Sequence, residues 1–244
     1  KANGRTIYLF IDEFSRFQDT SIAKTAIKLF SALGFEVKQA PIEESGRMAI
    51  SKGMVKRAKR LAERNVGILK ELISEQTPLV GIEPSTTLSF RDEYPDLLGE
   101  DISSLSQNVF LFDEFIAKQA DLGVITPELF TDKKQHILLH GHCQQKALTG
   151  TEFMERMLCI PTNYSVEVIP SGCCGMAGSY GYEKRHYEMS KTITNSVLIP
   201  TIKKAAADTI IAAPGTSCRE QIKHFSSRTA LHPIEILYNA LKEK

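Results

Sequence analysis

Tryptophan is absent from this sequence of 244 residues, and none of its five cysteines lies before position 143. An odd number of cysteines confined to one half of the chain argues against the disulfide framework of a small secreted protein and favours metal or redox chemistry. No apolar run approaches the roughly 20 residues that span a bilayer, and the start of the chain lacks the pattern of a signal peptide. We therefore predict a cytoplasmic protein without a membrane span.

The chain also has almost no net charge, because 30 basic side chains face 29 acidic ones. This balance argues against a protein that binds nucleic acid or an anionic membrane through a basic surface. The length suffices for one large domain or two smaller lobes. Because Lys1 to Gly4 include no initiator methionine, we expect a fragment of a longer protein from which a partner domain is missing.

Strand and helix patterns alternate along the chain, and their order repeats. Strands are predicted near residues 5–12, 35–38, 78–82, 135–140, 165–169 and 208–213, and helices near 21–33, 52–74, 103–120, 144–158, 183–206 and from 233. This order predicts an α/β fold with two Rossmann-like parallel-sheet lobes related by internal duplication. We place the first repeat at residues 1–122 and the second at 123–244.

Aligning the two halves pairs the turns that follow corresponding strands. Ser45 and Gly46 fall against Cys174 and Gly175, and residues 83–86 fall against residues 213–218 with a small gap. The cysteines of the second half therefore have counterparts without sulfur in the first half.

Four cysteines follow the ends of predicted strands in the second half, namely Cys143, Cys173, Cys174 and Cys218. In open parallel sheets the loops that leave the carboxyl ends of the strands converge on one crevice, where ligands bind. Thiolates are the preferred ligands of iron–sulfur clusters and also bind zinc. The spacing therefore predicts one metal site built from these four residues.

Glycines and histidines accompany these cysteines. Gly141, Gly172, Gly175 and Gly178 would allow positive φ and bring backbone N–H groups close to a cluster, and we predict that they contact the cofactor. His142 and His140 flank Cys143 on alternate positions, so either could bind the metal, donate a hydrogen bond to sulfur, or serve packing alone. Lys146, Lys184, Arg185 and Arg219 lie close in sequence to the cysteines and are candidates to lower thiol pKa values or to compensate an anionic cluster, although solvent exposure is expected for most of them.

Other interpretations of these residues stay open. Free cysteines are often ordinary buried thiols, and this is our prediction for Cys159, which lies in an apolar helical segment. The adjacent Cys173 and Cys174 could form a vicinal disulfide. Tyr180, Tyr182 and Tyr187 could line the crevice, or pack beneath the glycine-rich loop.

Three segments together carry a resemblance to a known family: residues 139–148 (LHGHCQQKAL), 171–178 (SGCCGMAG) and 214–219 (PGTSCR). They resemble the cysteine-rich CCG domain family, which includes iron–sulfur subunits of glycolate oxidase, anaerobic glycerol-3-phosphate dehydrogenase and lactate utilisation proteins, and the B subunit of heterodisulfide reductase. The chain looks most like the C-terminal domain of fusion proteins that join an FAD-linked oxidase of the D-lactate dehydrogenase type to iron–sulfur domains.

The resemblance covers essentially the whole chain, with informative departures. Residues 46–53 and 83–86 look like the family's first repeat, but Glu44 and Ser45 stand where members often have two cysteines, and Thr86 stands where they have a third. The resemblance therefore implies that the first ligand set is lost and that Cys143, Cys173, Cys174 and Cys218 hold the single remaining centre. Because no second cysteine follows Cys218 closely, we expect one cysteine-ligated centre, a [4Fe-4S] cluster or zinc.

The resemblance also implies a function. The chain would be a non-catalytic electron-transfer part of an FAD-dependent oxidoreductase acting on a 2-hydroxy acid such as D-lactate, glycolate or D-2-hydroxyglutarate, with a quinone or an electron carrier as acceptor. FAD would lie on a separate domain, and we predict no catalytic residue here. Its partners would be that FAD-binding oxidase domain and ferredoxin-like clusters, in a complex that could lie at the inner face of the membrane.

Two other functions remain open. The chain could be a structural or interaction domain that holds zinc or no metal. It could instead carry a thiol–disulfide redox site at Cys173 and Cys174, although a CxxC motif at a helix start is lacking.

Overall fold

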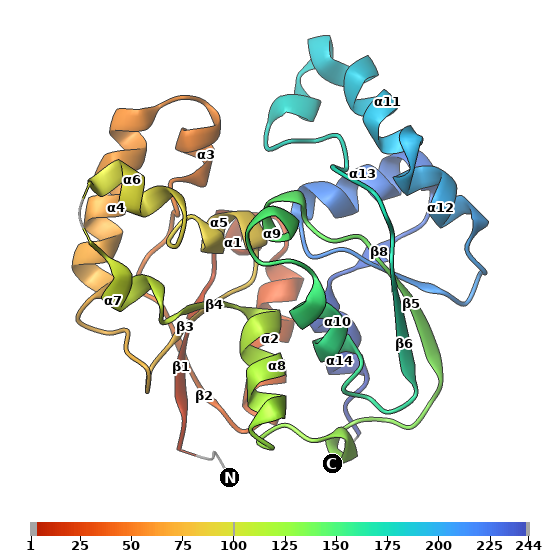
Figure 1. Cartoon of the computed structure of the whole chain (residues 1–244), viewed down its shortest axis with the longest axis horizontal. Coiled ribbons are helices and arrows are strands. Elements are labelled where there is room, and N and C mark those ends of the chain that lie inside the picture. The colour runs from red at the N-terminus through yellow and green to blue at the C-terminus, as the bar shows by residue number, and fades with distance from the viewer. Residues whose placement is uncertain (1–3, 100, 243–244) are drawn as a thin grey trace. The chain divides into compact units, whose positions relative to one another are not determined.

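The computed structural model describes residues 4–99 and 101–242. The chain divides into two compact units, with the division between Phe115 and Ile116. Each unit contains one four-stranded sheet in which all described pairings are parallel (Figure 1). This architecture confirms the predicted α/β class with two Rossmann-like lobes. Along the chain, the division between the units falls within helix α8 (Phe112–Asp121), whereas the repeat boundary after residue 122 stays a prediction.

The first unit has a sheet of order β2-β1-β3-β4. Register pairs Tyr8 of β1 with Leu79 of β3, and Leu79 in turn with Val109 of β4. In chain order its elements are β1 (Thr6–Phe10), α1 (Glu13–Phe17), α2 (Thr20–Ala32), β2 (Glu36–Gln39), α3 (Arg47–Ser51), α4 (Val55–Leu69), β3 (Leu79–Gly81), α5 (Pro84–Leu88), α6 (Glu93–Leu98), α7 (Ser103–Ser106) and β4 (Val109–Leu111).

The second unit has a sheet of order β6-β5-β7-β8, so each of its strands corresponds to one strand of the first unit. This shared strand order confirms the predicted duplication. After α8, its elements are η1 (Pro127–Leu129), β5 (Gln135–Leu139), α9 (Cys143–Leu148), α10 (Glu152–Leu158), β6 (Tyr164–Val168), η2 (Tyr180–Tyr182), η3 (Lys184–His186), α11 (Tyr187–Ser196), α12 (Leu198–Lys204), β7 (Ile210–Ala212), α13 (Thr216–Ser226), β8 (Ala230–Leu231) and α14 (Pro233–Asn239).

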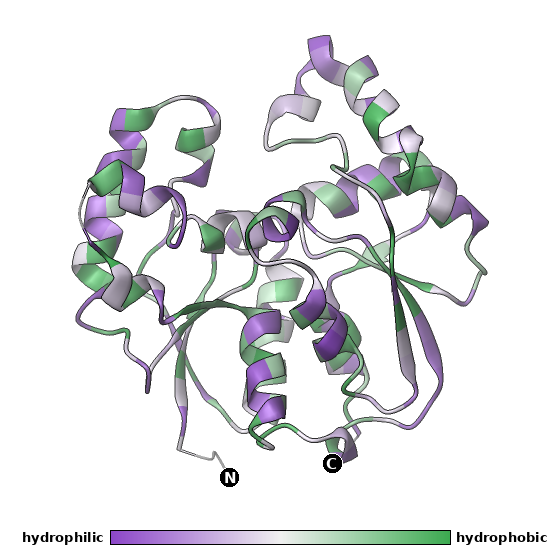
Figure 2. Cartoon of the chain, viewed as in Figure 1, coloured by the Kyte–Doolittle hydropathy of each residue, from purple (hydrophilic) through white to green (hydrophobic). Residues whose placement is uncertain are grey.

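Burial differs between the strands of the two sheets. All residues of the internal strand β3 are buried, whereas the edge strands β2 and β6 contain no fully buried residue. Helices lie on both faces of each sheet in Figure 1, as a parallel sheet requires. Purple and green bands alternate along α4 in Figure 2, because Ala58, Ala62, Val66 and Leu69 are buried at helical spacing between exposed basic residues.

The core of each unit lies beside its sheet. In the first unit, Phe10 meets Phe90 edge-on at 5.5 Å between ring centroids, and Tyr94 packs tilted against Phe90 at 4.6 Å. In the second unit, Cys174 and Cys218 belong to the apolar cluster itself. Two of the four candidate ligands are thus held by core packing.

Several elements differ from those predicted. Strand β4 lies inside the segment expected to be a helix over residues 103–120, and β4 and β8 are only three and two residues long. The helix expected over 144–158 is divided near Gly150, which has φ +76°. The helix expected over 183–206 is interrupted at Val197, three residues before Pro200.

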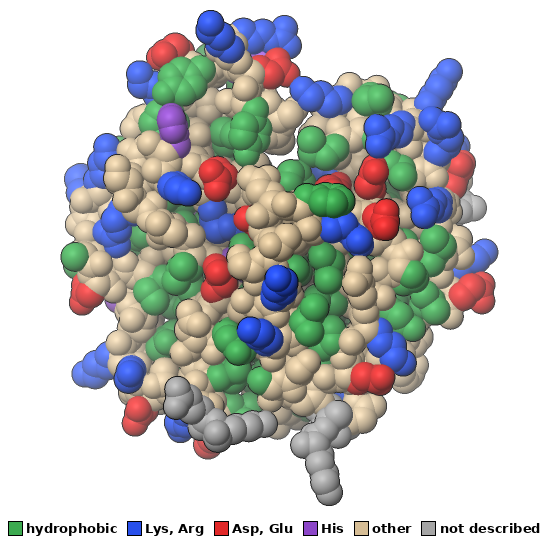
Figure 3. Space-filling view, turned by 180° about the vertical axis from the view of Figure 1, so that it is seen from behind, with side chains coloured by type: hydrophobic (Ala, Val, Ile, Leu, Met, Phe, Trp, Pro, Cys, Tyr) green, Lys and Arg blue, Asp and Glu red, His purple; other side chains and the backbone are tan. Residues whose placement is uncertain are grey.

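Within the described residues, no helix is long and apolar enough to cross a membrane. Figure 3 shows Lys and Arg side chains in blue and Asp and Glu side chains in red distributed over the displayed face. This mixture agrees with the nearly neutral composition.

Candidate metal centre

Three segments of the second unit bring the four predicted cysteines together. Cys143 is the first residue of α9, directly after β5, and Cys173 and Cys174 lie in the loop after β6. Cys218 is the third residue of α13, which follows β7. All three segments leave the carboxyl ends of neighbouring strands, as the sequence predicted.

The four thiols form a continuous series of contacts. Cys143 is hydrogen-bonded to Cys173, Cys173 to Cys174, and Cys174 to Cys218. Cys174 and Cys218 are buried, whereas Cys143 and Cys173 are partly exposed. All of them are free thiols, so Cys173 and Cys174 are not joined by the vicinal disulfide considered above.

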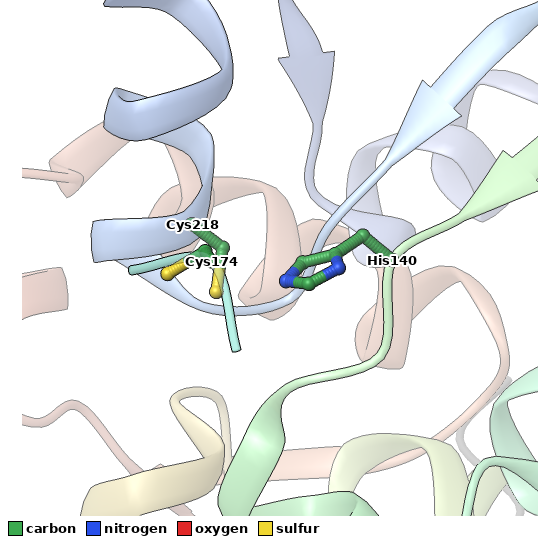
Figure 4. A group of neighbouring side chains, drawn as sticks. All are labelled: His140, Cys174 and Cys218. Carbon is green, nitrogen blue, oxygen red and sulfur yellow. The ribbon is translucent and has the colours of Figure 1, made fainter. Parts of the chain in front are cut away.

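His140 adds a nitrogen donor to the buried end of this series. The side chain is fully buried, and its donor atom lies within 4.8 Å of the Cys174 and Cys218 sulfurs. Figure 4 shows the imidazole, at the end of β5, facing these two cysteines. The buried Nε2 atom has no hydrogen-bond partner of standard geometry among the described residues.

Ser171 orients this imidazole. Its Oγ is 2.8 Å from His140 Nδ1 and 3.5 Å from the carbonyl oxygen of Ile169, to which the hydroxyl can donate. In the neutral tautomer whose Nδ1–H donates to this hydroxyl, the lone pair of Nε2 faces the cysteines and would be available to a metal. Ser171 was not predicted from the sequence, although it stands only two residues before the cysteine pair.

Hydrogen bonds between the thiols lower the pKa of two of them and raise the pKa of the other two. Donation from Cys143, then from Cys174, holds the pKa of Cys173 well below its usual value. Donation from Cys174, together with the nearby His140, lowers the pKa of Cys218 in the same way. The donors Cys143 and Cys174 have raised pKa values, and burial contributes to both. Thiolates at Cys173 and Cys218 are therefore favoured, and their negative charge would attract a metal cation.

His142 lies beside the site but has a capping role in this structure. As the N-cap residue of α9, its Nδ1 accepts a hydrogen bond from Gln144 N–H at 3.3 Å. A Cβ at Gly215 would lie 2.6 Å from Cδ2 of His142 and 3.2 Å from the Cys218 sulfur. Gly215, which the sequence analysis did not single out, therefore makes room for both side chains.

The four predicted glycines differ in their backbone requirements. Gly175 and Gly178 have φ of +94° and +65°, and Gly175 N–H donates to the Cys173 sulfur at 3.2 Å. Gly141 and Gly172 do not have positive φ, so that part of the expectation was wrong for them. Gly141 is needed for space, because a Cβ there would lie 2.6 Å from Thr151 Cγ2. Whether these glycines contact a cofactor stays a prediction.

Lys146 and Arg219 donate hydrogen bonds to backbone carbonyl groups of the loops that carry the candidate ligands. The Lys146 ammonium donates hydrogen bonds to the carbonyl oxygens of Ser171 and Gly172. The Arg219 guanidinium donates to the carbonyl oxygens of Ala213, at 3.0 Å, and Pro214, at 2.6 Å. We conclude that both residues position the ligand-bearing loops, in addition to any electrostatic effect.

Cys159 corrects one expectation, because it is exposed and not part of the core. The buried face of α10 is formed by Met154, Met157 and Leu158. Cys159 directly follows Leu158 as the C-cap residue of the helix, and its side chain does not lie on that buried face. Its position separates it from the four clustered thiols.

This donor set fits the metal groups that the sequence predicted. Four sulfurs and one imidazole nitrogen are the ligand types of iron–sulfur clusters and zinc. The buried Nε2 of His140 and the Gly175 N–H directed at sulfur are the features expected of such a site. Cys143, Cys173, Cys174, Cys218 and His140 are therefore the residues that could hold the group.

Oxygen-containing side chains occupy the corresponding positions of the first unit. Glu13 begins α1 as Cys143 begins α9, and its carboxylate accepts hydrogen bonds from Ser45 N–H at 3.0 Å and Ser45 Oγ–H at 2.8 Å. Thr86 is the third residue of α5, as Cys218 is of α13, and its hydroxyl donates to Glu83 O at 3.0 Å. Glu13 and Ser45 thus pair with each other, and Thr86 pairs with the backbone of its own helix.

Comparison with known proteins supports an oxidoreductase context. No family model matches the chain. It is 27% identical over 98% of its length to D-2-hydroxyglutarate dehydrogenase of Escherichia coli K12, and 30% identical over 93% to that of Pantoea ananatis. It is also 27% identical over 93% of its length to one subunit of the anaerobic glycerol-3-phosphate dehydrogenase of Escherichia coli K12.

The chain spans only part of these relatives: 23% and 22% of the two D-2-hydroxyglutarate dehydrogenases, and 57% of the glycerol-3-phosphate dehydrogenase subunit. The similarities are consistent with a domain of the CCG type, and membership of that family stays a prediction. Among solved structures, a hypothetical protein from Helicobacter pylori aligns over 99% of this chain and 50% of its own, with a TM-score of 0.60 and 11% identity. That likeness supports the fold alone.

Proposed function

We propose that this chain is the electron-transfer domain of a flavin-linked oxidoreductase, and that its second unit holds an iron–sulfur cluster through Cys143, Cys173, Cys174 and Cys218. The observation that carries the proposal is the meeting of four thiols from three separate segments in one site. Two of these thiols are buried in the apolar core, where a redox centre is shielded from water.

The relatives support electron transfer over substrate recognition. Their names specify different substrates, 2-hydroxyglutarate and glycerol 3-phosphate, yet both contain a segment similar to nearly the whole of this chain. A segment shared by enzymes with different substrates is suited to a step that follows substrate oxidation. We therefore assign substrate oxidation and FAD to another domain and no catalytic residue to this chain.

The residues of this chain would hold and tune the cluster. Gly175 N–H would donate to a ligand sulfur, and His140 would provide a further donor at the buried end of the site. When bound, the cluster would accept and release electrons at a potential set by such hydrogen bonds and by burial. The physiological substrate we propose is a 2-hydroxy acid, because D-2-hydroxyglutarate dehydrogenases are among the relatives.

The partners follow from the same proposal. They are an FAD-binding oxidase domain and ferredoxin-like clusters of the same protein or complex. We place the protein in the cytoplasm, where that complex could meet the inner face of the membrane.

A structural zinc site is the second candidate, and one observation favours it. The donor atoms of His140, Cys174 and Cys218 lie within 4.8 Å of one another, which is compact enough for a single ion. In that case the domain would stabilise or dock the catalytic part without transferring electrons. Thiol–disulfide chemistry at Cys173 and Cys174 is the third candidate, since the low pKa of Cys173 favours a thiolate.

The experiment is anaerobic purification of the chain, followed by iron, sulfide and zinc analysis and by EPR. A [4Fe-4S] cluster predicts about four irons with labile sulfide per chain. Stoichiometric zinc would support the second candidate. A metal-free chain with a titratable dithiol would support the third, and either result would overturn the proposal.

Single substitutions then test the ligand assignment. We expect Cys174→Ser to abolish the centre and Cys159→Ser, an exposed thiol outside the site, to leave it unchanged. Cys143→Ser should remove an iron–sulfur cluster, whereas His140→Gln should be the more damaging change for a compact zinc site. Full metal occupancy in Cys174→Ser would refute the assignment.

A further inference from the structure

A cavity of about 270 Å³ lies beside the cysteine loop, wholly within the second unit. Its walls come from the segment after Cys174, from α11 and from α13. The described residues that line it are Met176, Gly181, Tyr182, Tyr187, Ser190, Glu220, Gln221 and His224. The proposed cluster does not use these side chains.

The floor of this cavity is in direct contact with the loop that carries the candidate ligands. Gln221 Nε2 donates to Ser190 Oγ at 2.9 Å, and both side chains are buried. A Cβ at Gly175 would lie 2.4 Å from Ser190 O and 3.1 Å from Gln221 Nε2. Gly175 N–H also donates to the Cys173 sulfur at 3.2 Å. Gly175 therefore lies between the cavity residues Ser190 and Gln221 and a candidate ligand.

The upper walls are aromatic and carry exposed hydrogen-bonding groups. Tyr187 meets His224 edge-on with 6.2 Å between ring centroids, and its hydroxyl is 3.4 Å from His224 Nε2. Tyr182 is 58% exposed, so its ring is accessible from solvent. Such walls can pack against a flat ring and donate hydrogen bonds to its substituents.

The charge of the lining limits the class of ligand. Glu220 is an acid, and the described residues that line the cavity include no Lys or Arg. A nucleotide, a phosphate or a dicarboxylate would therefore bring negative charge to a lining that contains a carboxylate and, among the described residues, no guanidinium or ammonium group. The volume of about 270 Å³ lies just below the roughly 300–1,000 Å³ that is typical of ligand pockets, so it suits a single ring system.

We propose that this cavity binds the neutral ring of a quinone, which rests on the function proposed above and identifies its electron acceptor. Oxidation of a 2-hydroxy acid to the 2-oxo acid releases two electrons and two protons. Reduction of a quinone to the quinol consumes the same two electrons and two protons. The Tyr187 hydroxyl and the His224 ring, both at the solvent side, are placed to hydrogen-bond the quinone oxygens.

The test is direct binding of duroquinone to the anaerobically purified chain, measured by isothermal titration calorimetry. Every ring carbon of duroquinone that could react with a thiol carries a methyl group, so binding is separated from thiol addition. We expect saturable binding, and at least tenfold weaker binding by Tyr187→Ala and by His224→Ala, which alter different helices. Tyr180→Ala is the matched control, because Tyr180 stacks on His186 at 3.8 Å and does not line the cavity.

Two results would overturn the proposal: no saturable binding by the folded chain, or equal affinity in the wild type and in both cavity variants. Preferential binding of pyrophosphate at the same site would also overturn it. Metal analysis of the same samples separates the two proposals. Duroquinone binding by a chain without iron would preserve the cavity assignment and refute the cluster, whereas iron without binding would do the reverse.

Discussion

Substitution of Gly175 by alanine tests whether the backbone of the cysteine loop requires glycine. Its φ of +94° is unfavourable for a residue with a side chain, which costs about 1–3 kcal/mol. The new Cβ would also lie 2.4 Å from the Ser190 carbonyl oxygen, a backbone atom that cannot move cheaply. We expect the free energy of unfolding of the second unit to fall by about 3 kcal/mol in total, together with loss of the metal.

Hydrogen exchange by mass spectrometry on metal-depleted protein is the appropriate assay, because peptides from β5 and β7 report the second unit alone. A loss of about 3 kcal/mol corresponds to roughly 10²-fold faster exchange.

Gly172→Ala is the matched control in the same loop, since its new Cβ meets nothing within 4 Å. We expect a change within about 0.5 kcal/mol for this control. In the first unit, Gly46→Ala should cost about 1–2 kcal/mol from its φ of +82° alone, because the nearest atom is 3.5 Å away. Exchange in Gly175→Ala within threefold of the wild-type rate would refute this reasoning.

Two further predictions concern charged groups. Arg219→Ala should lower the free energy of unfolding of the second unit by about 2 kcal/mol, because two backbone carbonyl groups lose a charged donor. The same exchange assay measures this change. Arg185 is exposed, and Arg185→Ala should change the free energy of unfolding by less than about 0.5 kcal/mol. Burial raises the pKa of Glu13 in the folded protein. The contribution of this carboxyl group to the free energy of unfolding is therefore complete below the ordinary glutamate pKa, and it is lost as pH rises through the raised pKa of the folded state. Urea unfolding followed by circular dichroism from pH 4 to 8 should show a flatter pH dependence for Glu13→Gln, and an unchanged slope would contradict the assignment.

The parallel-sheet fold was predictable because its internal strands are apolar and are separated by helical periods. Runs such as Ile137 to Leu139 are buried on both faces, which leaves a continuous hydrophobic signal in the sequence. The two-residue strand β8 is too short to carry a recognisable period, and β4 was missed because its three residues lie inside a segment assigned to a helix over residues 103–120. Their pairing depends on the strands already in the sheet.

The cysteine site was predictable for a different reason. Topology places the carboxyl ends of parallel strands along one edge, so residues distant in sequence could be grouped without coordinates. The roles of Ser171 and Lys146 could not be anticipated in this way, because each depends on where a side chain reaches: Oγ to His140, and the ammonium to two loop carbonyls. Cys159 was misplaced because helical apolarity does not show which residue ends the buried face.

The first unit shows how a similar turn is built from polar side chains at the positions where the second unit has thiols. Gly46 keeps a positive φ at the position of Gly175, so the tight turn persists although no thiol adjoins it. Ser45 is instead held by the Glu13 carboxylate and by the Tyr94 hydroxyl, which donates to Ser45 O at 2.7 Å. Asn65 in turn donates to the Tyr94 oxygen at 2.8 Å, so buried polar groups of this turn form a hydrogen-bonded network. A loop of this shape is therefore compatible either with thiols that bind a metal or with polar groups that bind one another, and the side chains decide between them.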